Sequence, residues 1–160
     1  LLGSSTIDNV NFDILGNEYI ILKSNYNNVG SSISSLSILN CVNIQRIQLE
    51  NTSSHTHPSC TISLDNNPNL NLFEFENHRL INLTILNGLP LVTILRVRFN
   101  DLTSTALDNI IIALDNNGLS NGELRYDAQT SGASPNIGVS GTAYNDLILK
   151  NWVITGNVPI

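Results

Sequence analysis

One short pattern recurs along the first two thirds of this 160-residue chain. It places apolar residues at its first, fourth and sixth positions and a small or polar residue at its ninth. Eight copies of varying fidelity start at residues 7, 17, 33, 44, 59, 70, 80 and 92. Alternate copies are separated by 26 or 27 residues early in the chain and by 21 or 22 residues late. Periods of this length are typical of repeat architectures.

The fourth and sixth positions of each copy place two apolar side chains on the same face of a short strand. Two such strands occur in each repeat, which predicts two walls made of short parallel strands. The aliphatic faces of the two sheets are then expected to pack against each other. Because no single repeat can bury its own apolar face, neighbouring repeats must stack. The pattern therefore predicts a mostly β solenoid over residues 1–102.

The ninth position of several copies is a polar residue that suits a turn. Asn25, Asn67 and Asn100 occupy it, and their side chains are expected to hydrogen-bond backbone groups that the turn leaves unpaired. His78 occupies the same position. A turn-bonding substitute for Asn and a ligand or general base are both interpretations of His78.

These copies resemble the leucine-rich-repeat family. Residues 92–102 match its consensus Leu-x-x-Leu-x-Leu-x-x-Asn-x-Leu closely, and residues 70–80 match it with His in place of Asn. The turn Asn66-Asn67-Pro68-Asn69-Leu70 is similar to turns in the compact repeats of bacterial surface proteins and phage tail or fibre proteins. The resemblance covers about residues 7–102. The early copies depart from the consensus in repeat length and in the position of Asn.

A different pattern begins after Leu102. Apolar residues at helical spacing predict a helix of about 14 residues, with Thr103 or Ser104 as N-cap and Gly118 as its stop. A strand over 122–127, a loop over 128–141, a second helix over 142–151 and a strand over 152–154 are expected to follow. The helical residues expected to face the core are Leu107, Ile110, Ile111, Leu114, Ala143, Leu147 and Leu149.

Residues 103–160 resemble the C-terminal cap that follows such repeats in phage and bacterial proteins. The resemblance implies an α/β capping region of two helices and two strands that extends the parallel sheet. It would cover the open end of the solenoid, so that both regions form one continuous domain. Trp152 is interpreted as a buried plug of this cap, and the alternative is a platform for carbohydrate.

The composition excludes several classes of partner. The net charge is −6, and the seven Lys and Arg residues are scattered singly, which argues against nucleic acid and anionic membrane surfaces as partners. No apolar run approaches the roughly 20 residues of a membrane span. The start at Leu-Leu-Gly suggests the C-terminal piece of a longer protein. Cys41 and Cys60 are interpreted as small core residues, although the sequence leaves a disulfide open.

Motifs typical of enzymes are absent from the sequence. It contains no Gly-x-Ser-x-Gly elbow, dinucleotide-binding loop, P-loop or His-Glu-x-x-His helix, so we expect no enzyme. Glu74 and Glu76 flank Phe75 on one strand. They could act as a carboxylate pair, but a solvated strand face is the expected role.

Two longer segments insert extra residues at the same phase of the repeat. They contain Tyr26 and Asn27 in residues 23–32, and His55 and His57 in residues 50–59. Insertions at one phase of a solenoid map to loops on the same edge. Because rigid scaffolds commonly carry binding loops, this edge is the predicted ligand-binding patch, and the alternative is tolerated loop variation.

His55 and His57 also suggest a metal site. Two histidines at positions i and i+2 of an extended segment point the same way and can ligate a metal ion. Two nitrogen ligands make a weak site, but a homotrimer with this segment on its axis would supply six. An ordinary exposed loop is the alternative, and the sequence suggests no other cofactor.

The resemblance implies a non-enzymatic recognition module. We expect the terminal domain of a phage fibre, tail or other virion surface protein that binds a host surface glycan or protein. Its partners would then include other virion or surface proteins, and its location would be the virion, the cell surface or the extracellular space. The alternatives are an architectural or adhesin-like protein without its own ligand and, more remotely, an accessory domain of an enzyme.

Overall fold

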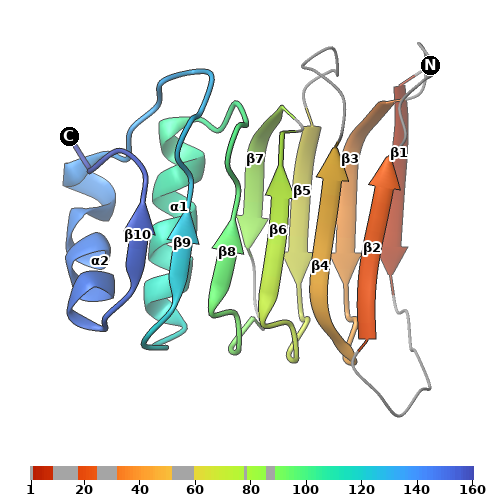
Figure 1. Cartoon of the computed structure of the whole chain (residues 1–160), viewed down its shortest axis with the longest axis horizontal. Helices are drawn as coiled ribbons and strands as arrows, with labels where there is room; N and C mark the ends of the chain where they lie inside the picture. The colour runs from red at the N-terminus through yellow and green to blue at the C-terminus, as the bar shows by residue number, and fades with distance from the viewer. Residues whose placement is uncertain (1, 9–17, 25–31, 52–59, 78, 86–88) are drawn as a thin grey trace.

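The computed structural model describes residues 2–8, 18–24, 32–51, 60–77, 79–85 and 89–160. Two layers of secondary structure run along the molecule, and the two termini lie at opposite ends (Figure 1). In chain order the elements are β1 Leu2–Asp8, β2 Glu18–Ser24, β3 Ser32–Leu39, β4 Ile44–Asn51, β5 Cys60–Asp65, β6 Leu72–Glu76, β7 Leu80–Ile85, β8 Ile94–Arg96, α1 Ser104–Asn116, β9 Glu123–Arg125, α2 Ile137–Leu149 and β10 Val153–Thr155.

The strands form two parallel sheets. The four-stranded sheet has the order β1-β3-β5-β7, and the six-stranded sheet has the order β10-β9-β8-β6-β4-β2. From β1 to β8 the chain therefore moves to the other sheet after every strand. The prediction of two walls of parallel strands is confirmed by this α/β arrangement.

The strand register confirms most of the predicted pattern. Ile38 pairs with Leu64, and Leu64 pairs with Ile85, as the alternate copies require. The same holds in the other sheet, where Ile47 pairs with Phe73 and Phe73 with Leu95.

The prediction for the first copy was wrong. It placed the strand centre at Val10 and Phe12, which lie outside the described residues, and so aligned Phe12 with Ile38, but Ile7 pairs with Ile38. Ser5 occupies the register position that Leu36 has on β3. Residues 2–8 therefore lack the apolar-x-apolar signature. The next pair of apolar residues with this spacing, Val10 and Phe12, was predicted in its place.

The core lies between the two sheets and continues beneath α1. In β5 every second side chain is buried, as expected for a strand with one face toward the core. Burial of each large aliphatic or aromatic side chain contributes about 1.5–3 kcal/mol, so this layer dominates the stability. The largest fully buried side chains are Tyr126, Phe73, Ile38, Ile44, Ile47, Ile62, Leu64, Leu70, Leu80, Leu83, Leu89 and Leu95.

Two buried asparagines connect successive repeats through backbone groups. Asn67 accepts a hydrogen bond from the Cys41 N–H (3.1 Å) and donates to the carbonyls of Ile38 (2.9 Å) and Asp65 (3.0 Å). Asn100 accepts from the Leu80 N–H (3.1 Å). It donates to the carbonyls of Phe75 (2.7 Å) and Arg98 (3.1 Å). The predicted turn role of both asparagines is confirmed, whereas Asn25 and His78 lie outside the described residues.

Gln129 makes the equivalent set of bonds one step later, and the sequence pattern did not reveal it. Its Oε1 accepts from the Leu102 N–H (3.0 Å), and its Nε2 donates to the carbonyls of Val97 (2.8 Å) and Tyr126 (3.0 Å). The hydrogen-bonding scheme of the asparagines thus continues into the C-terminal region, where no copy of the repeat pattern was found.

The first helix agrees with its prediction. α1 begins at Ser104, and the Oγ1 of the N-cap Thr103 accepts a hydrogen bond from the Ala106 N–H (3.1 Å). Gly118, which follows the helix, has φ of +73°, a conformation that favours glycine. α1 contacts β7, so it lies beside the last strand of the four-stranded sheet.

The second helix begins earlier than predicted. α2 starts at Ile137 instead of residue 142, because the side chain of Asn136 caps it by accepting a hydrogen bond from the Gly138 N–H (2.8 Å). Asp108 of α1 also holds this end, since it accepts from the Asn136 N–H (2.8 Å) and from the Ser140 hydroxyl (2.6 Å). Gly138 and Gly141 made the segment look like a loop.

The burial of the C-terminal region follows its prediction with one exception. Ala143 and Leu147 are buried as expected, but Leu149 is 80% exposed. Trp152 is only 4% exposed, and its Nε1 donates to the Leu119 carbonyl (2.8 Å), which confirms the buried plug. A Cβ atom at Gly122 would lie 2.6 Å from the Trp152 ring, so the indole packs directly on this glycine.

Replacing Asn100 with Ala should lower the free energy of unfolding by about 3 kcal/mol, because three backbone groups would lose their partner in a buried site. Chemical denaturation measures this change. Asn145→Ala is the matched control, since Asn145 is exposed on α2 and its loss should stay within about 0.5 kcal/mol. Equal effects of the two changes would contradict a structural role for Asn100.

Candidate functional site

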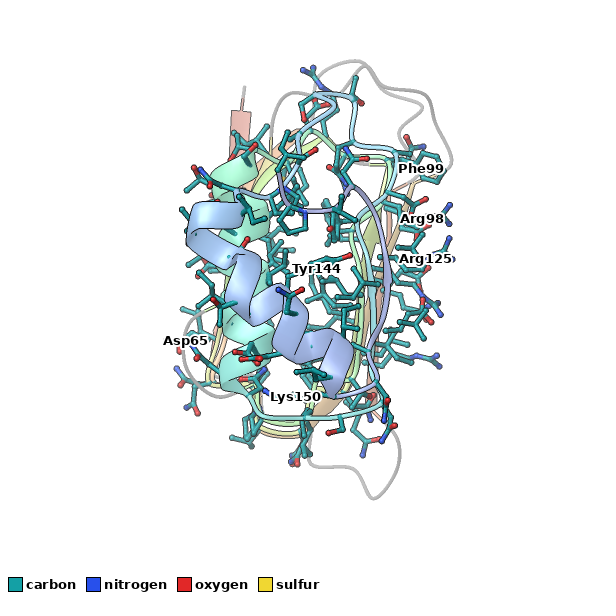
Figure 2. All side chains as sticks on the ribbon, turned by 90° about the vertical axis from the view of Figure 1, so that its left-hand side faces the viewer. Asp65, Arg98, Phe99, Arg125, Tyr144 and Lys150 are labelled. Carbon is teal, nitrogen blue, oxygen red and sulfur yellow. The ribbon has the colours of Figure 1, made fainter. Side chains whose placement is uncertain are left out.

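A ladder of charged and polar side chains covers the outer face of the six-stranded sheet. These residues alternate with core residues such as Phe75, Leu95 and Leu124, so the strand pleat directs them outward. Figure 2 shows Arg98 and Arg125 on this outer side. We call the following set the polar ladder: Gln48, Glu74, Glu76, Arg96, Arg98, Glu123, Arg125 and Asp127.

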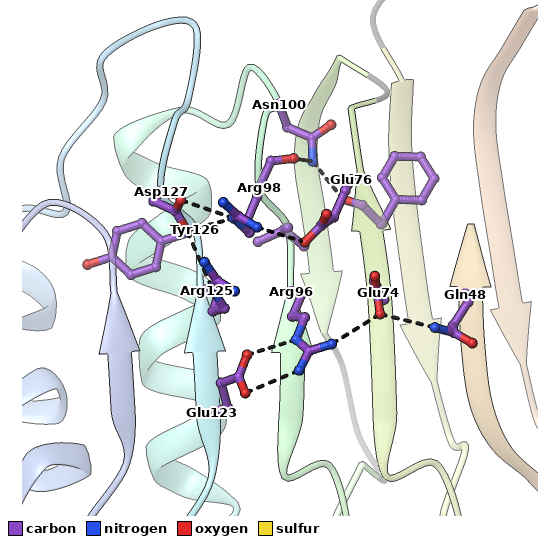
Figure 3. A network of polar contacts seen from close by, with 12 residues as sticks. Gln48, Glu74, Glu76, Arg96, Arg98, Asn100, Glu123, Arg125, Tyr126 and Asp127 are labelled. Atoms are coloured by element: carbon purple, nitrogen blue, oxygen red, sulfur yellow. Dashed lines mark hydrogen bonds and ion pairs between the residues drawn. The ribbon is translucent and has the colours of Figure 1, made fainter. Parts of the chain in front are cut away.

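One row of the polar ladder crosses four strands (Figure 3). Gln48 on β4 donates to Glu74 Oε2 on β6 (3.1 Å), and Arg96 NH1 on β8 donates to the same oxygen (3.4 Å). Arg96 also donates two hydrogen bonds to the carboxylate of Glu123 on β9, one from Nε (2.7 Å) and one from Nη2 (3.2 Å). The register of the sheet brings together residues that are 22 to 27 positions apart in the sequence.

A second row lies beside the first and is less evenly paired. Arg98 Nε lies 3.0 Å from each carboxylate oxygen of Asp127, and Arg98 NH1 lies 4.0 Å from Glu76 Oε1. Arg125 Nε is 3.7 Å from Asp127 Oδ1, which is an ion-pair distance but too long for a hydrogen bond. The two rows together tie β6, β8 and β9 side by side.

Phe99 adds an exposed aromatic ring next to the polar ladder. The ring is 41% exposed, and the Arg98 guanidinium carbon lies 4.7 Å from its centroid. This is the geometry of a cation–π contact. Figure 2 places Phe99 on the same outer side as Arg98 and Arg125.

The face has a different charge balance from the rest of the chain. Arg46 occupies an outward position of β4, so four of the arginines whose side chains the structure describes lie on this face. The described part of the face also carries four carboxylates and is therefore close to neutral. The chain as a whole has a net charge of −6, so its excess of negative charge lies elsewhere.

The ion pairs shift the pKa values of the groups that form them. The hydrogen bonds from Arg96 lower the pKa of Glu123, and the same contact raises the pKa of Arg96. Burial raises the pKa of Glu76 and outweighs its attraction to Arg98. A ligand would therefore meet a flat face of preformed guanidinium donors and carboxylate acceptors.

The structure does not test the predicted loop patch. Tyr26, Asn27, His55 and His57 all lie outside the described residues. Glu74 and Glu76 are described, and both lie on the outward, partly exposed face of β6, as the expected strand-face role requires. Each faces an arginine instead of the other carboxylate, and both are half-buried.

The sequence contained a signal for the polar ladder that was not used. Glu74-x-Glu76, Arg96-x-Arg98 and Glu123-x-Arg125-x-Asp127 alternate charged residues with apolar ones. Such alternation indicates a strand with one charged face. It does not reveal which carboxylate pairs with which arginine, because that depends on the strand register.

Cys41 and Cys60 are buried and unbonded to each other, as expected for small core residues, and burial raises the pKa of Cys60 to about 11. Among the described residues no three His, Cys, Asp or Glu side chains gather in a way that could hold a metal ion. Neither helix of that part is long and apolar enough to span a bilayer.

Comparisons with protein-family models, curated proteins and solved structures give no match to this chain.

Replacing Glu123 with Gln should lower stability by about 1 kcal/mol at pH 7. The pKa of Glu123 is lower in the folded protein than in the unfolded chain, so this stabilisation exists above about pH 4.3 and disappears as the pH falls through the lowered pKa. In denaturation experiments the stability difference between wild type and variant should thus shrink as the pH falls and vanish once Glu123 is protonated in the folded protein. Glu76→Gln is the control of opposite sign, because a carboxyl with a raised pKa resists ionisation and its replacement should cost nothing at pH 7.

Proposed function

We propose that residues 1–102 form a leucine-rich-repeat solenoid, that residues 103–160 form its cap, and that the chain is a non-enzymatic recognition module. Three observations support the solenoid. Successive strands from β1 to β8 alternate between the two sheets. Paired residues are offset by the repeat length, as for Ile38 and Leu64. Buried asparagines make equivalent hydrogen bonds in different repeats.

The C-terminal region has the features of a cap. β9 and β10 extend the six-stranded sheet, while α1 lies beside β7 in the other layer. Figure 2, viewed from this end, shows α2 in front of α1. A stack of repeats needs such a cover because its last core layer would otherwise be exposed.

The polar ladder is the observation that supports a recognition role. Its side chains are half-buried and held by mutual contacts on a parallel sheet, so binding would cost little side-chain entropy. Arginine and aromatic residues are enriched at interfaces, and this face presents Arg96, Arg98 and Arg125 beside the exposed Phe99. We propose a host surface glycan or protein as the partner, and a phage fibre, tail or other virion surface protein as the parent.

An architectural role is the second candidate, and the exposed apolar residues of the C-terminal region favour it. Ile137, Leu149, Val153 and Ile160 are each more than 60% exposed. Apolar surface of this kind suits permanent contact with another protein. Attachment only to a partner shell would support this second role, whereas a monomer that binds cells would support recognition.

Binding of the purified protein to panels of glycans and intact cells should fall at least about tenfold in Arg98→Ala and Phe99→Ala. Tyr26→Ala and His57→Ala test the loop patch in the same assay. Lys150→Ala is the control, since Lys150 pairs with Asp115 away from the polar ladder. A protein that binds no surface on the panel, or variants that all bind like wild type, would contradict the role assigned to this face.

The metal site proposed at His55 and His57 has its own test. Purified protein should contain zinc and sediment as a homotrimer, and both properties should be lost in His55→Ala and His57→Ala. Elemental analysis and analytical ultracentrifugation provide the measurements. Zinc content that is unaffected by both changes would exclude these histidines as ligands.

A further inference from the structure

Arg125 is the least satisfied charged group on the polar ladder. Arg96 makes hydrogen bonds to Glu123 and Glu74, and Arg98 makes two to Asp127. The Arg125 guanidinium makes none among the described residues, and its Nε is buried without a hydrogen-bond partner. Its ion-pair contact is with Asp127 Oδ1 at 3.7 Å, and that oxygen already accepts a hydrogen bond from Arg98.

The strand register places no carboxylate directly beside Arg125 on either neighbouring strand. Arg125 on β9 is the direct neighbour of Arg96 on β8, and like charges at adjacent positions repel each other. On the other side its neighbour is Thr155 on β10, which carries no charge. The side chain of Arg125 is still 32% exposed, so a ligand can reach it. Arg125 is therefore the arginine of the polar ladder whose hydrogen-bonding groups are used least.

We propose that Arg125 is the anchor of a carboxylate-binding site and that its ligand is a glycan containing uronic acid units. This inference rests on the recognition role proposed above and names the class of ligand. A planar guanidinium matches a carboxylate through paired hydrogen bonds. A carboxylate carries a single negative charge, so Glu76, Glu123 and Asp127 repel it less than they would repel a dianionic phosphate.

Two features favour a glycan over an acidic peptide. β9 is hydrogen-bonded on both sides, to β8 and to β10, so a peptide cannot add to it as a further strand. Phe99 presents an exposed apolar ring on the same face, and the C–H groups of a sugar ring can pack on such a surface. A uronic acid unit carries both a carboxylate that can bind Arg125 and a C–H face that can pack on Phe99.

The experiment measures binding of the whole chain to three probes by calorimetry. The probes are an oligogalacturonate, the same oligomer after reduction of its carboxyl groups, and poly-glutamate of equal charge. The wild-type protein should bind the oligogalacturonate and bind the reduced oligomer at least tenfold more weakly. Arg125→Gln and Phe99→Ala should each weaken binding of the oligogalacturonate about tenfold, while Lys150→Gln should leave it unchanged.

A second variant separates binding from folding. Thr155→Glu places a carboxylate beside Arg125 in the register of β9 and β10, so it should abolish binding while leaving the melting temperature unchanged or higher. Equal binding of the reduced oligomer, or full binding by Thr155→Glu, would overturn the proposal. Equal binding of poly-glutamate that depends on Arg125 would replace the glycan with an acidic peptide. If only other ligands bind, and still require Arg98, the recognition role stands and the uronate assignment fails.

Discussion

The burial of aliphatic side chains between two parallel sheets is the interaction on which the other features depend. Among the described side chains, β3 to β7 each contribute only two or three to the core, as in the pairs Ile62 with Leu64 and Phe73 with Phe75. No strand is long enough to form a core alone, so stability requires neighbours on both sides. This requirement fixes the strand register, and the register in turn decides which outward side chains become neighbours.

Connecting two facing sheets leaves backbone groups unpaired where the chain turns, and at three of the described turns an amide side chain satisfies them. Asn67, Asn100 and Gln129 each accept from one backbone N–H and donate to two carbonyls. Buried amides of this kind are tolerated because all their hydrogen-bonding groups have partners. The same solution extends from the proposed repeats into the proposed cap, which makes the two regions one continuous structure.

The polar ladder follows from the same geometry. A parallel sheet holds equivalent residues of successive strands about 4.8 Å apart, so an alternating charge pattern becomes rows of adjacent ions. Favourable pairs form where the signs alternate, as between Arg96 and Glu123, whereas Arg125 is left beside another arginine. Arg125 keeps an ion-pair contact with Asp127 but makes no hydrogen bond among the described residues, which is why it is the position that suggests a ligand.

The sequence by itself determined the strands with an apolar-x-apolar centre, the first helix and the turn asparagines, because these depend on local spacing and hydrogen bonding. The prediction failed at residues 2–8, where Ser5 replaces an apolar residue. It also failed at the start of α2, where hydrogen bonds to Asn136 and Asp108 stabilise the first turn although glycines follow. The pairing of the ladder residues was decided only by the tertiary structure. Residues such as Glu74 and Arg96 are 22 positions apart, and their contact exists only because the core sets the register between their strands.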